Sequence, residues 1–171
     1  MSNQPSLSPS RVGRPVFPAD YGVPEHNQGL LPWSYVEERM RTAKNYWVAT
    51  ASPTGKPAVT PVWGVWLDGR LYFDGAPSTR RGRNIRRNPR AAVHLESGDQ
   101  VVILEGTAAV LSGAPERGLA ERLAAAYTAK YGDMGYSPEP EQWDGGGLFV
   151  FTPKTGMGWT KFPEDATRWE F

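Results

Sequence analysis

The stretch from residue 46 to residue 73 restricts the fold most, because it consists of β-rich segments joined by short turns. Tyr46–Ala51 is rich in aromatic and β-branched residues, and a short turn separates it from a second run, Pro57–Leu67. Asp68-Gly69 then leads into Leu71–Phe73, and Asp-Gly between two such runs is a strong hairpin signal. The sequence therefore predicts consecutive antiparallel strands.

The rest of the chain adds strands and three helices. Further strands are predicted over Ala91–Glu96, Val101–Leu111, Leu148–Thr152 and Gly158–Phe162. Helices are predicted over Ser34–Ala43, with Ser34 and Glu37 as a capping box, over Arg80–Asn88, and between Pro115 and Gly132, where Leu119, Leu123, Ala126 and Tyr127 form a core-facing stripe. Six or seven strands, mostly joined by hairpins, favour a mainly antiparallel barrel with appended helices over a doubly wound parallel sheet.

Pro61 and Gly64 are unusual within the second predicted strand. Proline donates no ladder hydrogen bond, and glycine lets another group approach the backbone closely. Two interpretations follow. Either one face of this strand is kept for something other than a neighbouring strand, or the segment is an ordinary edge strand.

A length of 171 residues is typical of one domain. Residues 1–31 contain five prolines and no regular period, which predicts an arm that is disordered or extended on a neighbour, ahead of an ordered domain over residues 32–171. The chain has no apolar run near the ~20 residues that a membrane helix needs, and its start lacks the apolar core of a signal peptide. We therefore expect a cytoplasmic protein with no membrane partner.

The composition excludes several kinds of site. The absence of cysteine rules out disulfides, thiolate zinc sites and cysteine nucleophiles. With only His26 and His94, a metal site built from several histidines is not expected. Ser78 and Thr79 have no obvious histidine base, so the sequence shows no nucleophile arrangement and we name no catalytic residue.

A block of arginines is the main functional signal. No carboxylate occurs between Asp74 and Glu96, whereas the chain as a whole has a formal net charge of only +1. The block is thus a local positive pole, and it coincides with the start of a predicted helix. Free helix amides, hydroxyls and guanidiniums together suit a phosphate group. The arginines are Arg80, Arg81, Arg83, Arg86, Arg87 and Arg90.

Three interpretations of this block were weighed. A nucleic-acid surface would extend over several phosphates and carry exposed aromatic residues for stacking, but the surroundings are neutral. A compact site at a loop-to-helix junction better suits one phosphate of a small ligand, with Arg80 and Arg81 in the first turn. A solvated basic helix is the third possibility. We favour the small ligand and expect no nucleic-acid partner. A phosphate site without catalytic side chains fits a protein whose cofactor performs the chemistry.

The chain contains an ordered set of short motifs: Gly55-x-Pro57, Thr60-Pro61-Val62-Trp63, Asp68-Gly69-x-Leu71-Tyr72-Phe73, Thr79-Arg80-Arg81-Gly82-Arg83-Asn84 and Asn88-Pro89-Arg90. This set resembles the pyridoxamine 5′-phosphate oxidase-like split-barrel superfamily, and within it the flavin/deazaflavin oxidoreductases. The resemblance covers roughly residues 34–171 and implies a six-stranded antiparallel split β-barrel that forms a homodimer with cofactor sites at the interface.

The resemblance also implies a cofactor and its binding residues. FMN is the first expectation and the deazaflavin coenzyme F-420 the alternative, with hydride transfer to or from a small unsaturated or aromatic substrate. A non-enzymatic carrier or sensor of the cofactor is the other function considered. The implied residues are Thr60, Val62 and Trp63 beside the ring and ribityl chain, Phe73, Asp74 and Gly75 flanking the cofactor, Ser78, Thr79, Arg80 and Arg81 at the phosphate, Arg83 and Asn84 in support, and Trp159 and Arg168 from the tail.

The sequence departs from the family pattern in a way that restricts the expected substrates. A true pyridoxamine phosphate oxidase has an Arg-x-x-x-Leu-Leu-Lys-like strand and paired C-terminal arginines that bind the substrate phosphate. Here the strand reads Thr60-Pro61-Val62-Trp63-Gly64-Val65, and the tail contains the single Arg168. The sequence therefore argues against oxidation of vitamin B6 phosphates.

Overall fold

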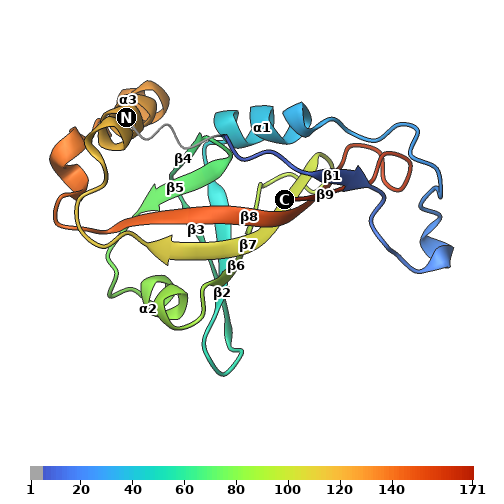
Figure 1. The fold of residues 1–171 in the computed structure, drawn as a ribbon, viewed down its shortest axis with the longest axis horizontal. Coiled ribbons are helices and arrows are strands. Elements are labelled where there is room, and N and C mark those ends of the chain that lie inside the picture. Colours follow the sequence, from blue (N-terminus) through green and yellow to red (C-terminus); the bar gives the residue numbers. More distant parts are fainter. Residues whose placement is uncertain (1–5) are drawn as a thin grey trace.

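A single antiparallel sheet forms the centre of the molecule (Figure 1). The computed structural model describes residues 6–171, and all nine strands of this part belong to the sheet. Hydrogen-bonded neighbours follow the order β1-β9-β8-β7-β6-β2-β3, and β4 pairs with β5, which joins β8. The strands are β1 (Arg11–Gly13), β2 (Tyr46–Ala51), β3 (Pro57–Val62), β4 (Val65–Leu67), β5 (Arg70–Asp74), β6 (Arg90–His94), β7 (Val101–Val110), β8 (Leu148–Trp159) and β9 (Thr167–Glu170).

The long strand β8 organises this sheet. One edge of β8 pairs with β7 along nearly its whole length, with a register shift between Glu105 and Gly106. The other edge pairs with β5 near Leu148 and with β9 near Gly158. Two different strands therefore continue the sheet from the two halves of β8, and the sheet stays open. The predicted split barrel is confirmed.

The predicted strand over Pro57–Leu67 is broken at Trp63-Gly64. β3 pairs with β2, and β4 pairs with β5, so the chain turns a corner between them. A Cβ atom on Gly64 would lie 2.6 Å from the carbonyl oxygen of Tyr72, so the corner requires the close approach that only glycine allows. β3 has no partner other than β2 among the described strands, which confirms the edge-strand interpretation of Pro61.

The predictions near the C-terminus were partly wrong. The strand that starts at Leu148 continues to Trp159 instead of ending at Thr152, and residues 160–166 form a turn instead of a strand over Gly158–Phe162. The true last strand is β9, which lies between β8 and β1. Its Trp169 is fully buried.

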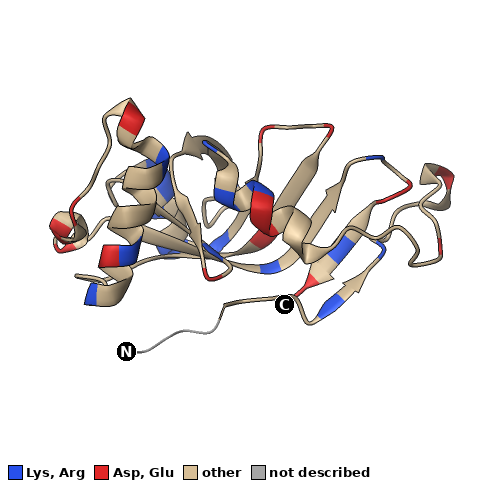
Figure 2. Cartoon of the chain, turned by 90° about the horizontal axis from the view of Figure 1, so that it is seen from above, with Lys and Arg blue, Asp and Glu red and all other residues tan. Residues whose placement is uncertain are grey.

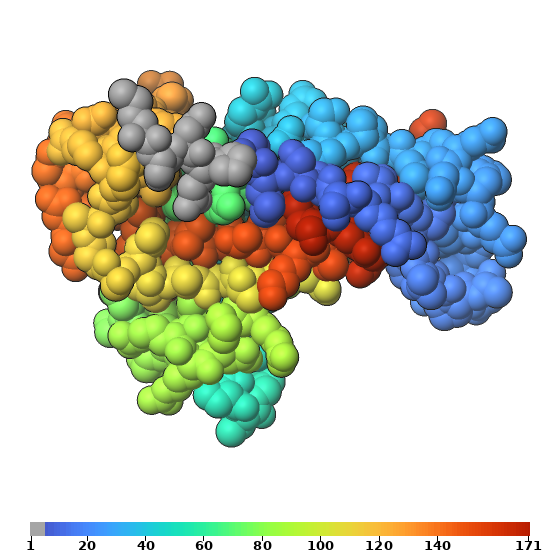
Figure 3. Space-filling view, in the orientation of Figure 1, coloured from blue at the N-terminus to red at the C-terminus, as the bar shows by residue number. Residues whose placement is uncertain are grey.

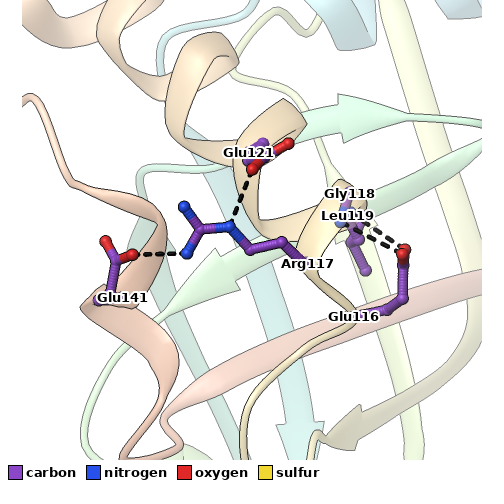
Figure 4. A network of polar contacts seen from close by, with 6 residues as sticks. All are labelled: Glu116, Arg117, Gly118, Leu119, Glu121 and Glu141. Atoms are coloured by element: carbon purple, nitrogen blue, oxygen red, sulfur yellow. Dashed lines mark hydrogen bonds and ion pairs between the residues drawn. The ribbon is translucent and has the colours of Figure 1, made fainter.

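Three α-helices lie around the sheet. They are α1 (Trp33–Thr42), α2 (Arg80–Arg87) and α3 (Arg117–Tyr131), with short 3-10 helices at Ala19–Tyr21, Gly132–Met134 and Pro140–Trp143. The capping box predicted for α1 was wrong, because Pro32 occupies the N-cap position and no side chain caps the helix. α3 is capped by Glu116, whose carboxylate accepts hydrogen bonds from the amides of Gly118 and Leu119 (Figure 4). None of the helices in residues 6–171 is long and apolar enough to cross a bilayer.

The buried side chains form two clusters. One lies between α1 and the sheet and includes Val36 and Met40. The other joins α3 to β4, β5 and β8 and includes Leu123, Tyr127 and Trp143. The apolar stripe predicted on α3 is therefore a core face, as expected. The second cluster holds α3 over the end of β8 that pairs with β5.

Residues 6–13 follow one edge of the sheet, and residues 14–31 form a loop beyond it, at the right of Figures 1 and 3. The amide of Leu7 donates to the carbonyl of Asp68 at 3.0 Å, and β1 pairs with β9. The Arg14 guanidinium donates to four backbone carbonyls, those of His26, Gln28, Glu164 and Ala166. The arm is thus bound to its own chain. The predicted boundary at residue 31 remains a prediction.

Candidate functional site

The start of α2 is built as an open helix N-terminus. The Thr79 hydroxyl accepts a hydrogen bond from the Gly82 amide at 3.1 Å and donates to the Ala76 carbonyl at 2.8 Å. A Cβ on Gly82 would lie 2.4 Å from the Pro77 carbonyl oxygen, so the loop before α2 packs tightly against the helix. The remaining first-turn amides have no intrahelical acceptor and give this end a partial positive charge.

The charge of α2 is not neutralised within the described chain. In Figure 2 acidic and basic residues alternate over the helices seen from above, whereas α2, at the lower edge of Figure 1, has only basic charged residues. None of its arginines forms an ion pair with a carboxylate of residues 6–171. Several donate to backbone carbonyls instead: Arg80 to Pro57 at 2.8 Å, Arg86 to Pro77 at 3.1 Å, and Arg83 to Ser78. These hydrogen bonds hold the loop in place, and the positive charges of the arginines remain available to a ligand.

Arg81 reaches from α2 toward the sheet. Its Nη1 donates to the Thr60 hydroxyl at 2.9 Å, and its guanidinium carbon lies 5.5 Å from the centroid of the Phe73 ring. Its Nε is inaccessible to solvent and has no partner among the described residues. Burial lowers the pKa of Arg81, and the charge of Asp74 partly opposes this shift. This half-buried guanidinium still has a free donor.

Gly75 leaves room for that guanidinium. Its φ is +152°, and a Cβ there would lie 2.9 Å from Nη2 of Arg81. Any larger residue would displace the guanidinium. Asp74, one residue earlier, accepts a hydrogen bond from the Tyr136 hydroxyl. Burial, together with the bond to Asp74, raises the pKa of Tyr136, so the hydroxyl keeps its proton at neutral pH.

An aromatic wall stands beside these polar groups. The Trp63 and Tyr131 rings stack with centroids 4.7 Å apart and an interplanar angle of 9°, and the Tyr136 ring lies 6.1 Å from that of Trp63. Trp63 is 36% exposed although it sits at the corner between two strands. An open indole of this kind offers a platform for a planar ring.

A cleft of about 370 Å³ opens next to Asp74. One wall is the loop before α2 and the other is the segment around the 3-10 helix Pro140–Trp143. Arg117 at the start of α3 binds that segment through an ion pair with Glu141, and it also pairs with Glu121 one turn along the same helix (Figure 4). The lining residues are Asp74, Gly75, Ala76, Pro77, Gln142, Trp143, Gly146 and Gly147.

The structure brings together part of the set implied by the resemblance. Thr60, Trp63, Asp74 and Gly75 lie with residues 78–81 around Arg81 and Tyr136. Val62 and Phe73 are buried in the core beneath them, and Asn84 donates to the Thr50 hydroxyl under α2. Val62, Phe73 and Asn84 thus support the site from below.

The tail residues of that set lie elsewhere in the chain. Trp159 ends β8, and Arg168 on β9 binds Glu170 at 3.1 Å. Leu148, at the other end of β8, pairs with Asp74. At a rise of roughly 3.3 Å per residue, these ends are about 36 Å apart, so only a second copy could bring the tail to this site. Its assignment stays a prediction.

Neither Tyr136 nor the role of Tyr131 could be predicted from the sequence. Tyr136 lies in a segment rich in glycine and acids that has no regular period. Its position depends on how α3 packs on β5, which no local pattern encodes. No group of three or more potential metal ligands occurs within residues 6–171.

Comparison with known proteins identifies the family of the chain. The family model described as pyridoxamine 5′-phosphate oxidase matches residues 35–159. No curated protein matches the sequence. Because this family model covers most of the chain, the match identifies the family and not only the fold.

Solved structures share the fold at low sequence identity. A NimC/NimA family protein from Clostridium acetobutylicum is 19% identical, with a TM-score of 0.60 over 84% of this chain and 93% of the other. An F420 reductase is 23% identical, with a TM-score of 0.53 over 74% and 98%. HutZ, a heme storage protein from Vibrio cholerae, is 18% identical, with a TM-score of 0.54 over 70% and 88%.

Proposed function

The chain belongs to the pyridoxamine 5′-phosphate oxidase family, and on that basis we propose that it is an oxidoreductase that uses FMN or, alternatively, the deazaflavin coenzyme F-420. The observation that carries the proposal is the half-buried Arg81 beside an open helix N-terminus, with an Nη2 group that faces Gly75 and has no hydrogen-bond partner among the described residues. A phosphate is the group that best satisfies such a set of donors. The F420 reductase among the structural neighbours supports the deazaflavin alternative.

The residues present fit such a cofactor. The phosphate would bind the amides of the α2 start, the hydroxyls of Ser78 and Thr79, and the guanidiniums of Arg80 and Arg81. The planar ring would lie against Trp63, and Thr60 would be near the chain that links ring and phosphate. The cofactor supplies hydride transfer when bound. These side chains would only bind and orient it, and the buried aromatic residues would limit the access of water.

Asp74 and Tyr136 would control protons at the edge of the site. The Tyr136 hydroxyl keeps its proton at neutral pH and donates a hydrogen bond to the Asp74 carboxylate. The carboxylate therefore stays fixed, and the pair presents one defined hydrogen-bonding edge. The absence of a basic residue in the strand segment 60–65 supports the view that the substrate is not a vitamin B6 phosphate. We propose a small unsaturated or aromatic substrate for the adjoining cleft.

We further propose that the protein is a homodimer. A shallow groove of about 520 Å³ crosses the outer face of β2, β6, β7 and β8 and is lined mainly by small side chains such as Ala49, Ala92 and Gly106. Such a face suits an isologous contact with a second copy. Light scattering at micromolar concentration tests this, and a cofactor-bound monomer would refute it.

A carrier or sensor of the cofactor is the second candidate. The heme storage protein among the neighbours supports it, because the same fold can hold a ligand without turning it over. Stopped-flow reduction and reoxidation of the bound cofactor separates the two candidates. In an oxidoreductase, the bound cofactor is reoxidised faster as the concentration of an unsaturated acceptor rises. In a carrier, the rate of reoxidation does not depend on any such acceptor.

A further inference from the structure

Lys130 is an unusual residue at the end of α3. Its Nζ donates to the Tyr46 hydroxyl at 2.6 Å and to the Gly64 carbonyl at 3.2 Å. It also lies 4.8 Å from the centroid of the Tyr46 ring and 5.6 Å from that of Tyr131. No carboxylate within residues 6–171 forms an ion pair with it. A half-buried cation is therefore held only by neutral groups.

This arrangement costs stability. Burial disfavours the ammonium and lowers the pKa of Lys130 to about 8. The titratable groups that face it are Tyr46 from β2 and Tyr131 from α3, and both stay neutral because burial raises their pKa values. Asp74 is the carboxylate whose charge acts on Tyr131, and it does not compensate Lys130 directly. Methionine would fill similar space without the desolvation penalty of a buried charge.

The contacts of Lys130 converge on the corner between β3 and β4. The Gly64 amide donates to the Tyr131 hydroxyl at 3.0 Å. That hydroxyl is also 2.9 Å from the Gly64 carbonyl oxygen and 2.8 Å from that of Lys44, but it has one proton and can donate to only one of them. When the hydroxyl donates its hydrogen bond to the Lys44 carbonyl, the Gly64 carbonyl depends on Lys130 as its side-chain donor.

The corner carries the exposed aromatic residue of the candidate site. Trp63 precedes Gly64 and lies outside both strands, so no ladder hydrogen bond fixes it. Its position depends on the stacking with Tyr131 and on how the Gly64 backbone is held. Lys130 and Tyr131 are adjacent at the end of α3, and together they hold the peptide and the ring.

We propose that Lys130 is a positioning residue that fixes the Trp63–Gly64 corner, and with it the aromatic wall of the site, at a cost in stability. The inference rests on the proposed function only in so far as Trp63 faces the cofactor ring. Because the ammonium donates charge-assisted hydrogen bonds, its deprotonation weakens the hold on the Gly64 carbonyl.

The test compares Lys130→Met with Lys130→Arg and with Lys56→Met, which removes an exposed lysine in the β2–β3 turn. Three quantities are measured: the melting temperature, the indole N–H resonance of Trp63 (identified with Trp63→Phe), and the affinity for FMN and the deazaflavin. We expect Lys130→Met to raise the melting temperature by about 2–4 °C, to shift or broaden the Trp63 resonance, and to weaken cofactor binding about tenfold. Lys130→Arg keeps the parent resonance, and Lys56→Met changes none of the three.

A pH series on the parent protein gives an independent readout. The Trp63 resonance should titrate near pH 8, and the titration should be lost in Lys130→Met. A lower melting temperature in Lys130→Met with an unchanged Trp63 resonance would overturn the proposal and leave Lys130 a structural residue. A Trp63 resonance that follows Lys130 in a protein that binds neither cofactor supports the positioning role and refutes only the proposed function.

Discussion

Replacement of Arg81 by methionine tests the phosphate site most specifically. Arg81 combines a hydrogen bond from Nη1 to Thr60 with an Nη2 group that faces Gly75 and has no partner in the described chain. A charge-assisted hydrogen bond contributes about 1.5–3 kcal/mol. At 1.4 kcal/mol per tenfold change, the loss of one such bond to a phosphate weakens binding roughly 10- to 150-fold.

The fold should survive this change. Burial already lowers the pKa of the Arg81 guanidinium, which shows that its charge is poorly solvated, and methionine removes that charge while keeping most of the contact with the Phe73 ring. The loss of the bond to the Thr60 hydroxyl costs little because Thr60 is only half-buried. Circular dichroism and the melting temperature check that the variant is folded.

The matched control is Arg87→Met. Arg87 lies on the same helix and is exposed, so this variant makes the same change in net charge at a different place. Calorimetric titration with FMN and with the deazaflavin is run at one fixed ionic strength. If Arg81→Met binds within twofold of the parent, or if Arg87→Met is equally damaging, the phosphate does not bind where we place it.

Three further changes test other parts of the account. Gly75→Ala should weaken cofactor binding about tenfold because its Cβ meets Arg81. Gly113→Ala, at a positive φ of +80° and with open space around it, should lower only the melting temperature by a few degrees. Equal affinities in calorimetry would argue against a close contact at Gly75. Deletion of residues 166–171 removes β9 with its buried Trp169 and should prevent folding, as judged by circular dichroism, whereas a folded deletion with normal stability would contradict the role of β9 in the sheet. Arg14→Ala removes donors to four carbonyls, so it should lower the free energy of unfolding in urea by about 1–3 kcal/mol and speed proteolysis between residues 15 and 30. An unchanged cleavage rate would show that other contacts hold the arm.

Several parts of the fold that are encoded in local sequence were predicted correctly, although the capping box of α1 was not. Asp68-Gly69 forms the turn between β4 and β5, and both residues have positive φ, as the tight hairpin turns require. The start of α2 was also identified correctly, because a threonine before a helical run is a common N-cap. The family resemblance pointed to the split barrel that the open sheet confirms.

The features that depend on long-range packing could not be predicted. The sequence from Pro57 to Leu67 reads as one β-rich run, and its break at Trp63-Gly64 follows from contacts with Tyr131 and Lys130 in the distant α3. The bond between Tyr136 and Asp74 likewise joins residues more than sixty positions apart. The proline-rich arm gave no β signal, because β1 exists only through its pairing with β9.

Direct titration of ligand-free protein with FMN, the deazaflavin and hemin tests the central claim. We expect saturable binding of one phosphate-bearing flavin or deazaflavin per chain, with micromolar or tighter affinity that Arg81→Met weakens. Hemin is the informative competitor because two structural neighbours are described as heme storage and heme-binding proteins. His94, which stacks on Trp47, is one of the two histidines in the chain that could bind the heme iron. Tight hemin binding that is lost in His94→Ala, together with no binding of FMN or the deazaflavin, would contradict the account.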